Sequence, residues 1–304
     1  EVVDGGRLIP FPNESWNDPN SPDASRLDTV LGVQFDREGI LWMLDNGMRS
    51  GITPKLVGWD VSEDELYKVI PLPQPVTLPE SFLNDLAVDR DREHIYIADP
   101  TRGDRPAIIV VHIASGSARR VLEAHESVAP EMIDLVIDQT PVQIRRPDGN
   151  TFRPRVGINP IALDAKNEWL YYGPMHGTAM YRVRTFDLTN AKMSAVLLAE
   201  KVEFFGNKPI SDGSSVNLAG EVYISDIGNN AIGKINAQGS YQQLFHDDAL
   251  LRWPDAFSFG PDDWCYVVVN QIHLGPVLNA GEDATEAPYL IVRFKDDAGG
   301  VVGR

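Results

Sequence analysis

The stretch NPIALDAKNEWLYYGP (159–174) carries the pattern that decides the fold. An apolar strand ends before Asp164, a short polar turn follows, and a second apolar strand begins at Trp169. Four further stretches repeat this pattern without a gap: LGVQFDREGILWMLDN (31–46), NDLAVDRDREHIYIAD (84–99), DGSSVNLAGEVYISDI (212–227) and DAFSFGPDDWCYVVVN (255–270). Because Asp, Asn and Gly favour turns, each stretch predicts a β-hairpin.

Two more strands follow several of these hairpins. KLVGWDVSEDELYKVIPLP (55–73), IIVVHIASGSARRVL (108–122) and AIGKINAQGSYQQLF (231–245) each predict a strand, a polar turn and a strand. Four antiparallel strands per repeat are typical of a propeller blade, and blades stack around an axis to bury their faces. The repeats therefore predict an all-β, six-bladed β-propeller of four-stranded blades, formed as one domain by residues 1–304.

Three segments outside the hairpins complete this prediction. EVVDGGRLIPFP (1–12) is similar to the later half of a repeat, so the first blade is expected to lack its inner hairpin, which roughly 30–40 further N-terminal residues would supply. The alternative is a five-bladed propeller in which these residues add to an existing blade. YLIVRF (289–294) is expected as an outer strand of the last repeat, and residues 134–152 as an inserted hairpin.

Composition restricts the function classes. Lys and Arg number 27 against 44 Asp and Glu, which gives a formal net charge of −17. Such a polyanion is repelled by nucleic acids and anionic membrane surfaces, so we expect a small-molecule ligand rather than either of these partners. A single cysteine, Cys265, excludes an intrachain disulfide framework and a multi-thiolate zinc site. A soluble protein is expected, periplasmic or secreted, with the compartment left open.

The candidate site lies at one mouth of the channel. The first strand of each blade lines the channel, so the first residues of the five repeats form a ring at one end: Leu31, Asn84, Asn159, Asp212 and Asp255. The second strands return to the same end and bring Asp45, Asn46, Asp99, His176, Asp226, Asn229, Asn270 and His273 close to the ring.

These residue types predict two kinds of site. Carboxylate and amide oxygens suit either a polar ligand or an oxygen-seeking divalent cation such as Ca²⁺. The predicted ligand-binding residues are Asn46, Asn84, Asn159, Asp212, Asp255 and Asn270, and the predicted catalytic residues are His176, His273 and Asp255. The structural alternative is that Asp and Asn only begin strands and the histidines only belong to surface loops. Motifs of serine hydrolases, P-loop proteins, dinucleotide-binding folds and HExxH metalloproteases are absent from the sequence.

The chain resembles the major royal jelly protein/Yellow family over nearly its full length. The resemblance is carried by SFLNDLAVD (81–89), GINPIALD (157–164), LYYGPMHGTAMYRV (170–183), ISDGSSV (210–216), NAIGKIN (230–236) and LRWPDAFSF (251–259). It is nearest to bacterial members described as dopachrome-tautomerase-related, which share an end like AGGVVGR (298–304). The resemblance implies a six-bladed propeller. It also implies a mouth that binds small amines or takes part in the conversion of melanin precursors.

A more distant resemblance is to the SMP-30/gluconolactonase propellers, which use a divalent metal to hydrolyse lactones. It implies that Asn159 and Asp212 are metal ligands. The Glu that the family takes from its first blade is not found, because Leu31 and Gly32 stand in its place.

Three function classes follow, and the sequence leaves open whether the protein is an enzyme. The first is a Yellow-type propeller that binds or isomerises a polar small molecule in the mouth. The second is a divalent-metal-dependent hydrolase of a lactone or ester. The third is a propeller that serves as a non-catalytic interaction platform.

Overall fold

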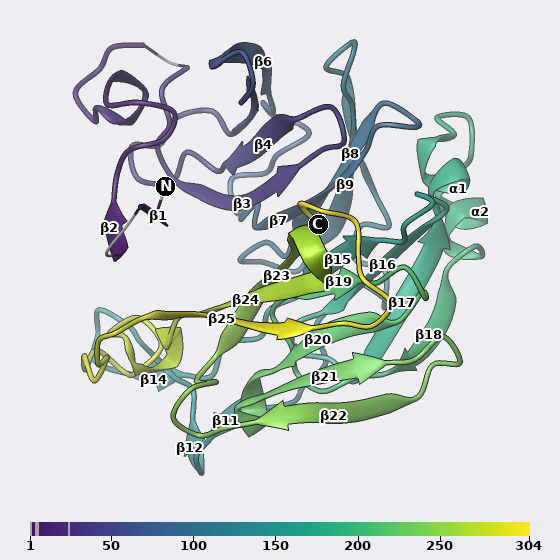
Figure 1. The fold of residues 1–304 in the computed structure, drawn as a ribbon. Helices are drawn as coiled ribbons and strands as arrows, with labels where there is room; N and C mark the ends of the chain where they lie inside the picture. The colour runs from purple at the N-terminus through teal and green to yellow at the C-terminus, as the bar shows by residue number, and fades with distance from the viewer. Residues whose placement is uncertain (1, 4–5, 24) are drawn as a thin grey trace.

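The computed structural model describes residues 2–3, 6–23 and 25–304, whose blades are arranged in a ring (Figure 1). From the inner strand outward, the first two blades are β3 (Val30–Phe35), β4 (Ile40–Asp45), β5 (Lys55–Asp60) and β6 (Glu65–Pro71), then β7 (Asp85–Asp89), β8 (His94–Asp99), β9 (Ala107–His112) and β10 (Ala118–Val121). The next two are β15 (Ile158–Leu163), β16 (Trp169–Pro174), β17 (Ala179–Arg184) and β18 (Glu203–Asn207), then β19 (Ser214–Val216), β20 (Val222–Asp226), β21 (Ala231–Ile235) and β22 (Tyr241–His246).

All five predicted hairpins are present as antiparallel pairs of first and second strands. In the third blade, for example, Ile161 lies opposite Tyr172 and Leu163 lies opposite Leu170. The predicted turn residue Asp36 accepts hydrogen bonds from the backbone N–H groups of Glu38 (2.9 Å) and Ile40 (3.1 Å). Asp89, Asp164 and Asn217 accept backbone hydrogen bonds in the same way, whereas the fifth hairpin has Gly260 at this position.

The last blade has three strands: β23 (Pro254–Phe259), β24 (Trp264–Val269) and β25 (Leu290–Lys295). The prediction that YLIVRF is an outer strand of this blade is confirmed. At the other end of the chain, β1 (Val2–Val3) and β2 (Arg7–Leu8) form a short hairpin. The fold is that of a six-bladed propeller in which part of one blade is missing.

An open sector separates the first blade from the last. Leu31 and Val33 on β3 are 41% and 56% exposed, and Ile291 on β25 is 58% exposed. Between the other blades, such side chains are buried in shared clusters. Trp42 of the first blade lies in one cluster with Ile95 of the second, for instance. The exposed apolar side chains therefore mark the faces that lack a neighbouring blade.

The remaining elements are short. The segment 134–152 forms two hairpins, made by β11 (Val136–Ile137) with β12 (Thr140–Pro141) and by β13 (Ile144–Arg145) with β14 (Thr151–Phe152). The helical elements are α1 (Thr185–Thr189), α2 (Ala195–Ala199) and the 3₁₀ turns η2 (Ser15–Asn17), η3 (Ile227–Asn229), η4 (Pro261–Asp263) and η5 (Ile272–Leu274). Within the described ranges, none of the helices has the length and apolar character needed to cross a membrane.

Candidate functional site

A cavity of about 1630 Å³ extends along the channel from its mouth to Gly303 and Arg304, and it continues into the open sector. Every first residue of the five repeats lines it: Leu31, Asn84, Asn159, Asp212 and Asp255. Asn270 and His176 line it as well. The structure therefore brings together most of the residues that the sequence places at the mouth.

Backbone irregularities direct three of these residues toward the channel. The pairing register shifts between Val30 and Val33, between Ile158 and Ile161, and between Pro254 and Phe257. Each shift is a β-bulge at the start of a first strand, and bulges re-aim side chains next to functional sites. Leu31, Asn159 and Asp255 lie within these three bulges.

A chain of hydrogen bonds, here called the amide relay, links three blades across the mouth. The Asn84 Nδ2 donates to Asn159 Oδ1, and Asn159 Nδ2 donates to Asp212 Oδ1. The indole Nε1 of Trp253 donates to the other carboxylate oxygen of Asp212 at 2.6 Å. Trp253 has a φ of 57°, which is rare for a bulky side chain and is tolerated where the surroundings fix it.

Four carboxyl groups line the cavity, and three of them, Asp85, Asp212 and Asp255, lie at the mouth, whereas Asp283 is exposed. Arg304 also lines the cavity, but its guanidinium donates to Val88 O and Asn167 Oδ1 rather than to these carboxyl groups. Asp85, Asp212 and Asp255 form no ion pair in the part of the chain that the structure describes. Burial raises the pKa of Asp85 to about 7 and that of Asp212 to about 6. Burial, together with the charges of Asp212 and Asp85, also raises the pKa of Asp255 well above its ordinary value. Asp255 accepts one hydrogen bond, from Asn270 Nδ2 at 2.7 Å.

An apolar roof covers part of this polar floor. The Gln143 N–H donates to Leu278 O (3.1 Å), and the Ala280 N–H donates to Gln143 O (3.0 Å). These bonds join the inserted hairpins to the long loop between β24 and β25. Beneath them, Leu135, Ile137, Val142, Met175, Ile227 and Trp253 form one buried apolar cluster. The cavity can therefore hold a ligand with a polar or charged group and an apolar body.

Both predicted histidines are neutral near pH 7. His176 is 1% exposed, and its Nδ1 accepts from the Val156 N–H at 3.1 Å, so its proton is on Nε2. His273 does not line the cavity but stacks on Trp253 with ring centroids 5.8 Å apart. Burial lowers the pKa of each to about 4. His176 Nε2 and His273 Nδ1 have no hydrogen-bond partner among the described residues.

Other polar residues predicted near the ring stabilise the fold instead. Asn46 is buried outside the cavity, where its Oδ1 accepts from the Met48 N–H at 3.2 Å. Asp45 pairs with Lys55 (2.8 Å), and Asp99 pairs with Arg120 (2.6 Å). Because their charges are already neutralised by neighbours, these carboxylates have little left to offer a ligand.

Sequence reasoning missed Asp85 and the hydrogen bond between Trp253 and Asp212. Asp85 is the second residue of its repeat, where the other repeats have the small or cyclic residues Gly32, Pro160, Gly213 and Ala256. A lone charged residue at that position was the signal that could have found it. Nothing in the sequence indicates the hydrogen bond from Trp253 to Asp212, because 41 residues separate them.

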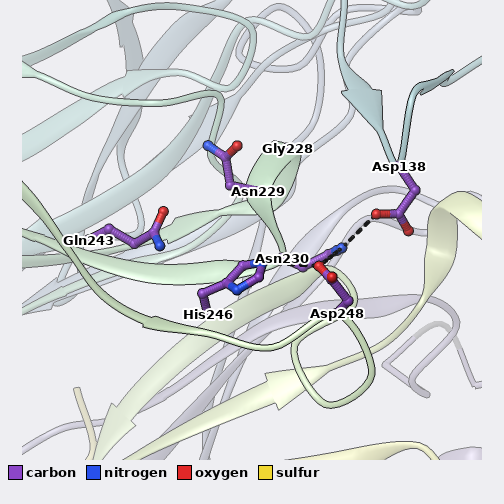
Figure 2. Close-up of a pocket in the computed structure, with 7 residues that line it drawn as sticks. All are labelled: Asp138, Gly228, Asn229, Asn230, Gln243, His246 and Asp248. Atoms are coloured by element: carbon purple, nitrogen blue, oxygen red, sulfur yellow. Dashed lines mark hydrogen bonds and ion pairs between the residues drawn. The ribbon is translucent and has the colours of Figure 1, made fainter.

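A second, smaller cavity of about 340 Å³ lies between the inserted hairpins and the fourth blade (Figure 2). Asn230 Nδ2 donates to Asp138 Oδ1 (3.0 Å) and to Asp248 Oδ1 (3.2 Å). His246 Nε2 lies 3.0 Å from the same oxygen of Asp248. These contacts fasten the β11–β12 turn to the fourth blade, and this turn belongs to the roof.

The predicted metal ligands fit a divalent cation poorly. Both carboxylate oxygens of Asp212 accept hydrogen bonds, and the Asn159 Oδ1 accepts one from Asn84. Across residues 2–3, 6–23 and 25–304 there is no group of three or more His, Cys, Asp or Glu side chains placed to hold a metal. Oxygen-seeking cations need several free oxygen ligands.

Comparisons with known proteins agree with the resemblance noted above. The family profile described as "Major royal jelly protein" matches residues 29–257. Major royal jelly protein 1 of Apis mellifera is 25% identical over 252 residues, which is 77% of this chain and 54% of the relative. The Drosophila melanogaster dopaminechrome tautomerase is 30% identical over 107 residues, 31% of this chain and 23% of that protein. The chain spans about half the length of the royal jelly proteins that it matches.

Solved structures share the propeller fold at low sequence identity. A protein described as a presumed gluconolactonase has a TM-score of 0.51 and 14% identity, covering 80% of this chain and 71% of its own. A gluconolactonase from Xanthomonas campestris has a TM-score of 0.49 and 12% identity, covering 78% and 68%. The likeness to the first of these two structures concerns the fold alone.

Proposed function

The chain belongs to the major royal jelly protein family, and we propose that it binds a small organic cation with an apolar body in the mouth of its propeller. The observation that carries the proposal is the set of three carboxyl groups, Asp85, Asp212 and Asp255, which line one cavity and form no ion pair with any described residue. A ligand cation would neutralise charges that the protein leaves uncompensated.

The roof supports an apolar body for this ligand. Trp253 belongs to the apolar cluster while its indole N–H fixes Asp212. An ammonium group on the floor and an aromatic or aliphatic body under the roof would satisfy both parts of the cavity. This proposal agrees with the amine binding that the family resemblance implies. The narrower likeness to bacterial dopachrome-tautomerase-related members stays a prediction.

Titration calorimetry with three probes of one shape tests the proposal. We expect phenethylamine to bind at least tenfold more tightly than phenethyl alcohol or phenylacetate, because only the amine carries a positive charge. Asp212→Asn should weaken amine binding by about tenfold, whereas Asp248→Asn removes the same charge outside the mouth and should not. Equal binding of the three probes would contradict the proposal.

Proton transfer to and from a bound ligand is a second candidate activity. Asp85 and Asp212, with pKa values of about 7 and 6, are suited to exchange protons near neutral pH, and the neutral His176 lies in the same cavity. The relative named dopaminechrome tautomerase supports isomerisation of an aminochrome as the reaction to test. It would move a proton between two positions of one ligand, so no oxidant is needed.

Absorption spectroscopy of an aminochrome with the protein tests this activity. We expect its conversion to accelerate, and to slow at least tenfold in Asp85→Asn, because a neutral amide cannot accept the proton. Repeating binding and conversion after treatment with EDTA covers the hydrolase alternative: lactone hydrolysis lost on EDTA treatment and restored by Ca²⁺ would favour it instead. Binding without any conversion would favour a purely binding protein.

A further inference from the structure

We propose that residues 296–304, here called the crossing segment, hold the ring of blades closed at the end of the channel opposite the mouth. The end of the chain marked C lies between β3, β7 and β15 (Figure 1). This region is the turn end, where first strands pass into second strands.

The crossing segment contacts the turn end of the first strand of every blade. Gly303 lies close to Phe35, and Arg304 forms hydrogen bonds with Val88 and Asn167. Gly299 forms a hydrogen bond with Leu218, and both Gly303 and Arg304 form hydrogen bonds with Phe259. The Phe259 N–H donates to Arg304 O (2.7 Å), and the Gly303 N–H donates to Phe259 O (2.8 Å). The Leu218 N–H donates to Gly299 O at 2.9 Å. One segment thus joins blades that are distant in sequence.

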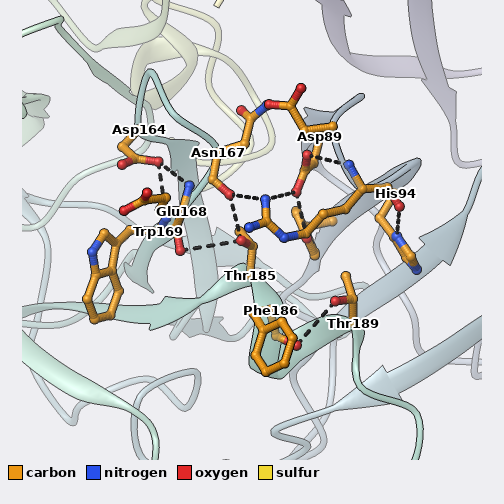
Figure 3. Close-up of polar contacts among 12 residues, drawn as sticks. Asp89, His94, Asp164, Asn167, Glu168, Trp169, Thr185, Phe186 and Thr189 are labelled. Carbon is orange, nitrogen blue, oxygen red and sulfur yellow. Dashed lines mark hydrogen bonds and ion pairs between the residues drawn. The ribbon is translucent and has the colours of Figure 1, made fainter.

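Arg304 reaches the boundary between the second and third blades. Its guanidinium donates to Val88 O (2.8 Å) and to Asn167 Oδ1 (2.6 Å). Figure 3 shows Asn167 in the surrounding network, where its carbonyl accepts from Thr185 Oγ1 at 2.6 Å. The same carbonyl accepts from Arg92 Nη1 of the second blade at 2.7 Å. Arg304 therefore binds Asn167, a residue that other hydrogen bonds already hold in place.

Two glycines let the segment pass close to the blades. A Cβ at Gly300 would lie 2.1 Å from the ring of Phe259, and one at Gly303 would lie 2.6 Å from Phe35 Cβ. Gly303 also has a φ of 90°, which side chains rarely adopt. The glycine-rich sequence AGGVVGR is explained by this close passage.

The crossing segment also joins the last blade to the first. Phe259 ends β23 of the last blade and Phe35 ends β3 of the first, and the crossing segment touches both across the sector. Asp255 and Leu31 lie near the mouth ends of the same two strands. Resting on the proposed function, the inference extends to the ligand: loosening the segment should also disturb the mouth.

Hydrogen exchange and thermal unfolding of the full chain test the proposal without a ligand. Arg304→Ala should raise amide exchange in β3 and β23 by about tenfold, while the outer strands β17 and β18, which the crossing segment does not contact, change less, and it should lower the midpoint of thermal unfolding by about 4 °C. Arg293→Ala is the matched control, because Arg293 stacks on Trp264 of its own blade (4.2 Å). Exchange that rises equally in every blade, or only within residues 296–304, would overturn the proposal.

A second variant keeps the test independent of charge. Gly300→Ala should reproduce the effect on β3 and β23, whereas Gly228→Ala, where the nearest atom to a new Cβ is 3.5 Å away, should not. Phenethylamine binding provides the functional arm, with an expected loss of about fivefold in Gly300→Ala, because Gly300 does not line the cavity whereas Arg304 does. Faster exchange with unchanged affinity would overturn the link to the mouth. If phenethylamine fails to bind even the unaltered chain, the proposed function fails and the exchange results still decide the closure.

Discussion

Asp36 at the turn end of the channel and Asp212 and Asp255 at the mouth have different kinds of hydrogen-bond and charge partners. At the turn end, Asp36 accepts hydrogen bonds from two backbone amides and from Trp42 Nε1, and it pairs with Arg90 at 3.3 Å. At the mouth, Asp212 receives only neutral donors, and Asp255 receives only an amide. Both ends are built from the same repeated strands.

The difference teaches how to separate structural from functional acids in a repeat protein. Buried charges usually have partners, and a carboxylate that has only neutral ones is kept at a cost in stability. A repeat places Asp at both ends for its turn and bulge chemistry. The absence of a compensating cation distinguishes Asp85, Asp212 and Asp255 from paired acids such as Asp36, Asp45 and Asp99.

The largest expected effect tests the turn end. Asp36→Ala should lower the free energy of unfolding by about 3–4 kcal/mol, because it leaves two amides, an indole N–H and Arg90 without their acceptor. Asp255→Ala should change it by less than about 1 kcal/mol. Urea unfolding of both variants measures the contrast, and equal losses would break the comparison.

The pH dependence of stability is the next effect. The pKa values of Asp85 (about 7) and Asp212 (about 6) are raised in the folded state, so that state binds more protons than the unfolded chain between about pH 4 and 7. Stability should therefore fall by about 1–3 kcal/mol as pH rises through this window. Asp85→Asn should flatten the curve. A curve unchanged by that substitution would show that the mouth is not its source.

Trp253→Phe should produce a smaller change. It removes the N–H that donates to Asp212 at 2.6 Å and helps to keep this carboxylate ionised. The pKa of Asp212 should rise further, so amine affinity at pH 7 should fall by about threefold to fivefold. Calorimetry at pH 8.5 sharpens the test, since the loss should shrink once the carboxylate is ionised in both proteins.

The smallest expected effect concerns Asn46. Asn46→Ala should change amine affinity by less than about twofold, because Asn46 lies outside the cavity and caps a local turn. An Asn270→Ala variant, which removes the donor to Asp255, is the positive control. A loss of affinity in Asn46→Ala equal to that of the control would extend the mouth to the turn that follows β4.

The ring of blades could be predicted because the repeat is visible in the amino-acid sequence. The spacing from Asn159 to Trp169 fixes a strand, a turn and a strand, and radial packing then places Asn84, Asn159 and Asp212 at one mouth. Asn46 shows the limit of that reasoning, because one residue of a turn can point into a blade rather than toward the axis.

The rest depends on contacts between distant segments. Trp253 meets Asp212 only because a strained backbone turns its indole over the mouth. Asp85 faces the cavity at a repeat position where the other repeats have only Gly, Pro or Ala. The crossing segment and the roof join loops from different blades, and no local periodicity encodes such pairings.

The amide relay has a polarity, and Asp212 sets it. A carboxylate can only accept, so Asn159 must turn its nitrogen toward Asp212 and its oxygen toward Asn84. Asn84 donates an amide hydrogen to Asn159, so its own side-chain carbonyl oxygen can accept a hydrogen bond from another donor. The ionised Asp212 thereby determines, through Asn159, that Asn84 presents a hydrogen-bond acceptor to a ligand. Loss of the negative charge on Asp212 would remove this preference without any change in the residue that contacts the ligand.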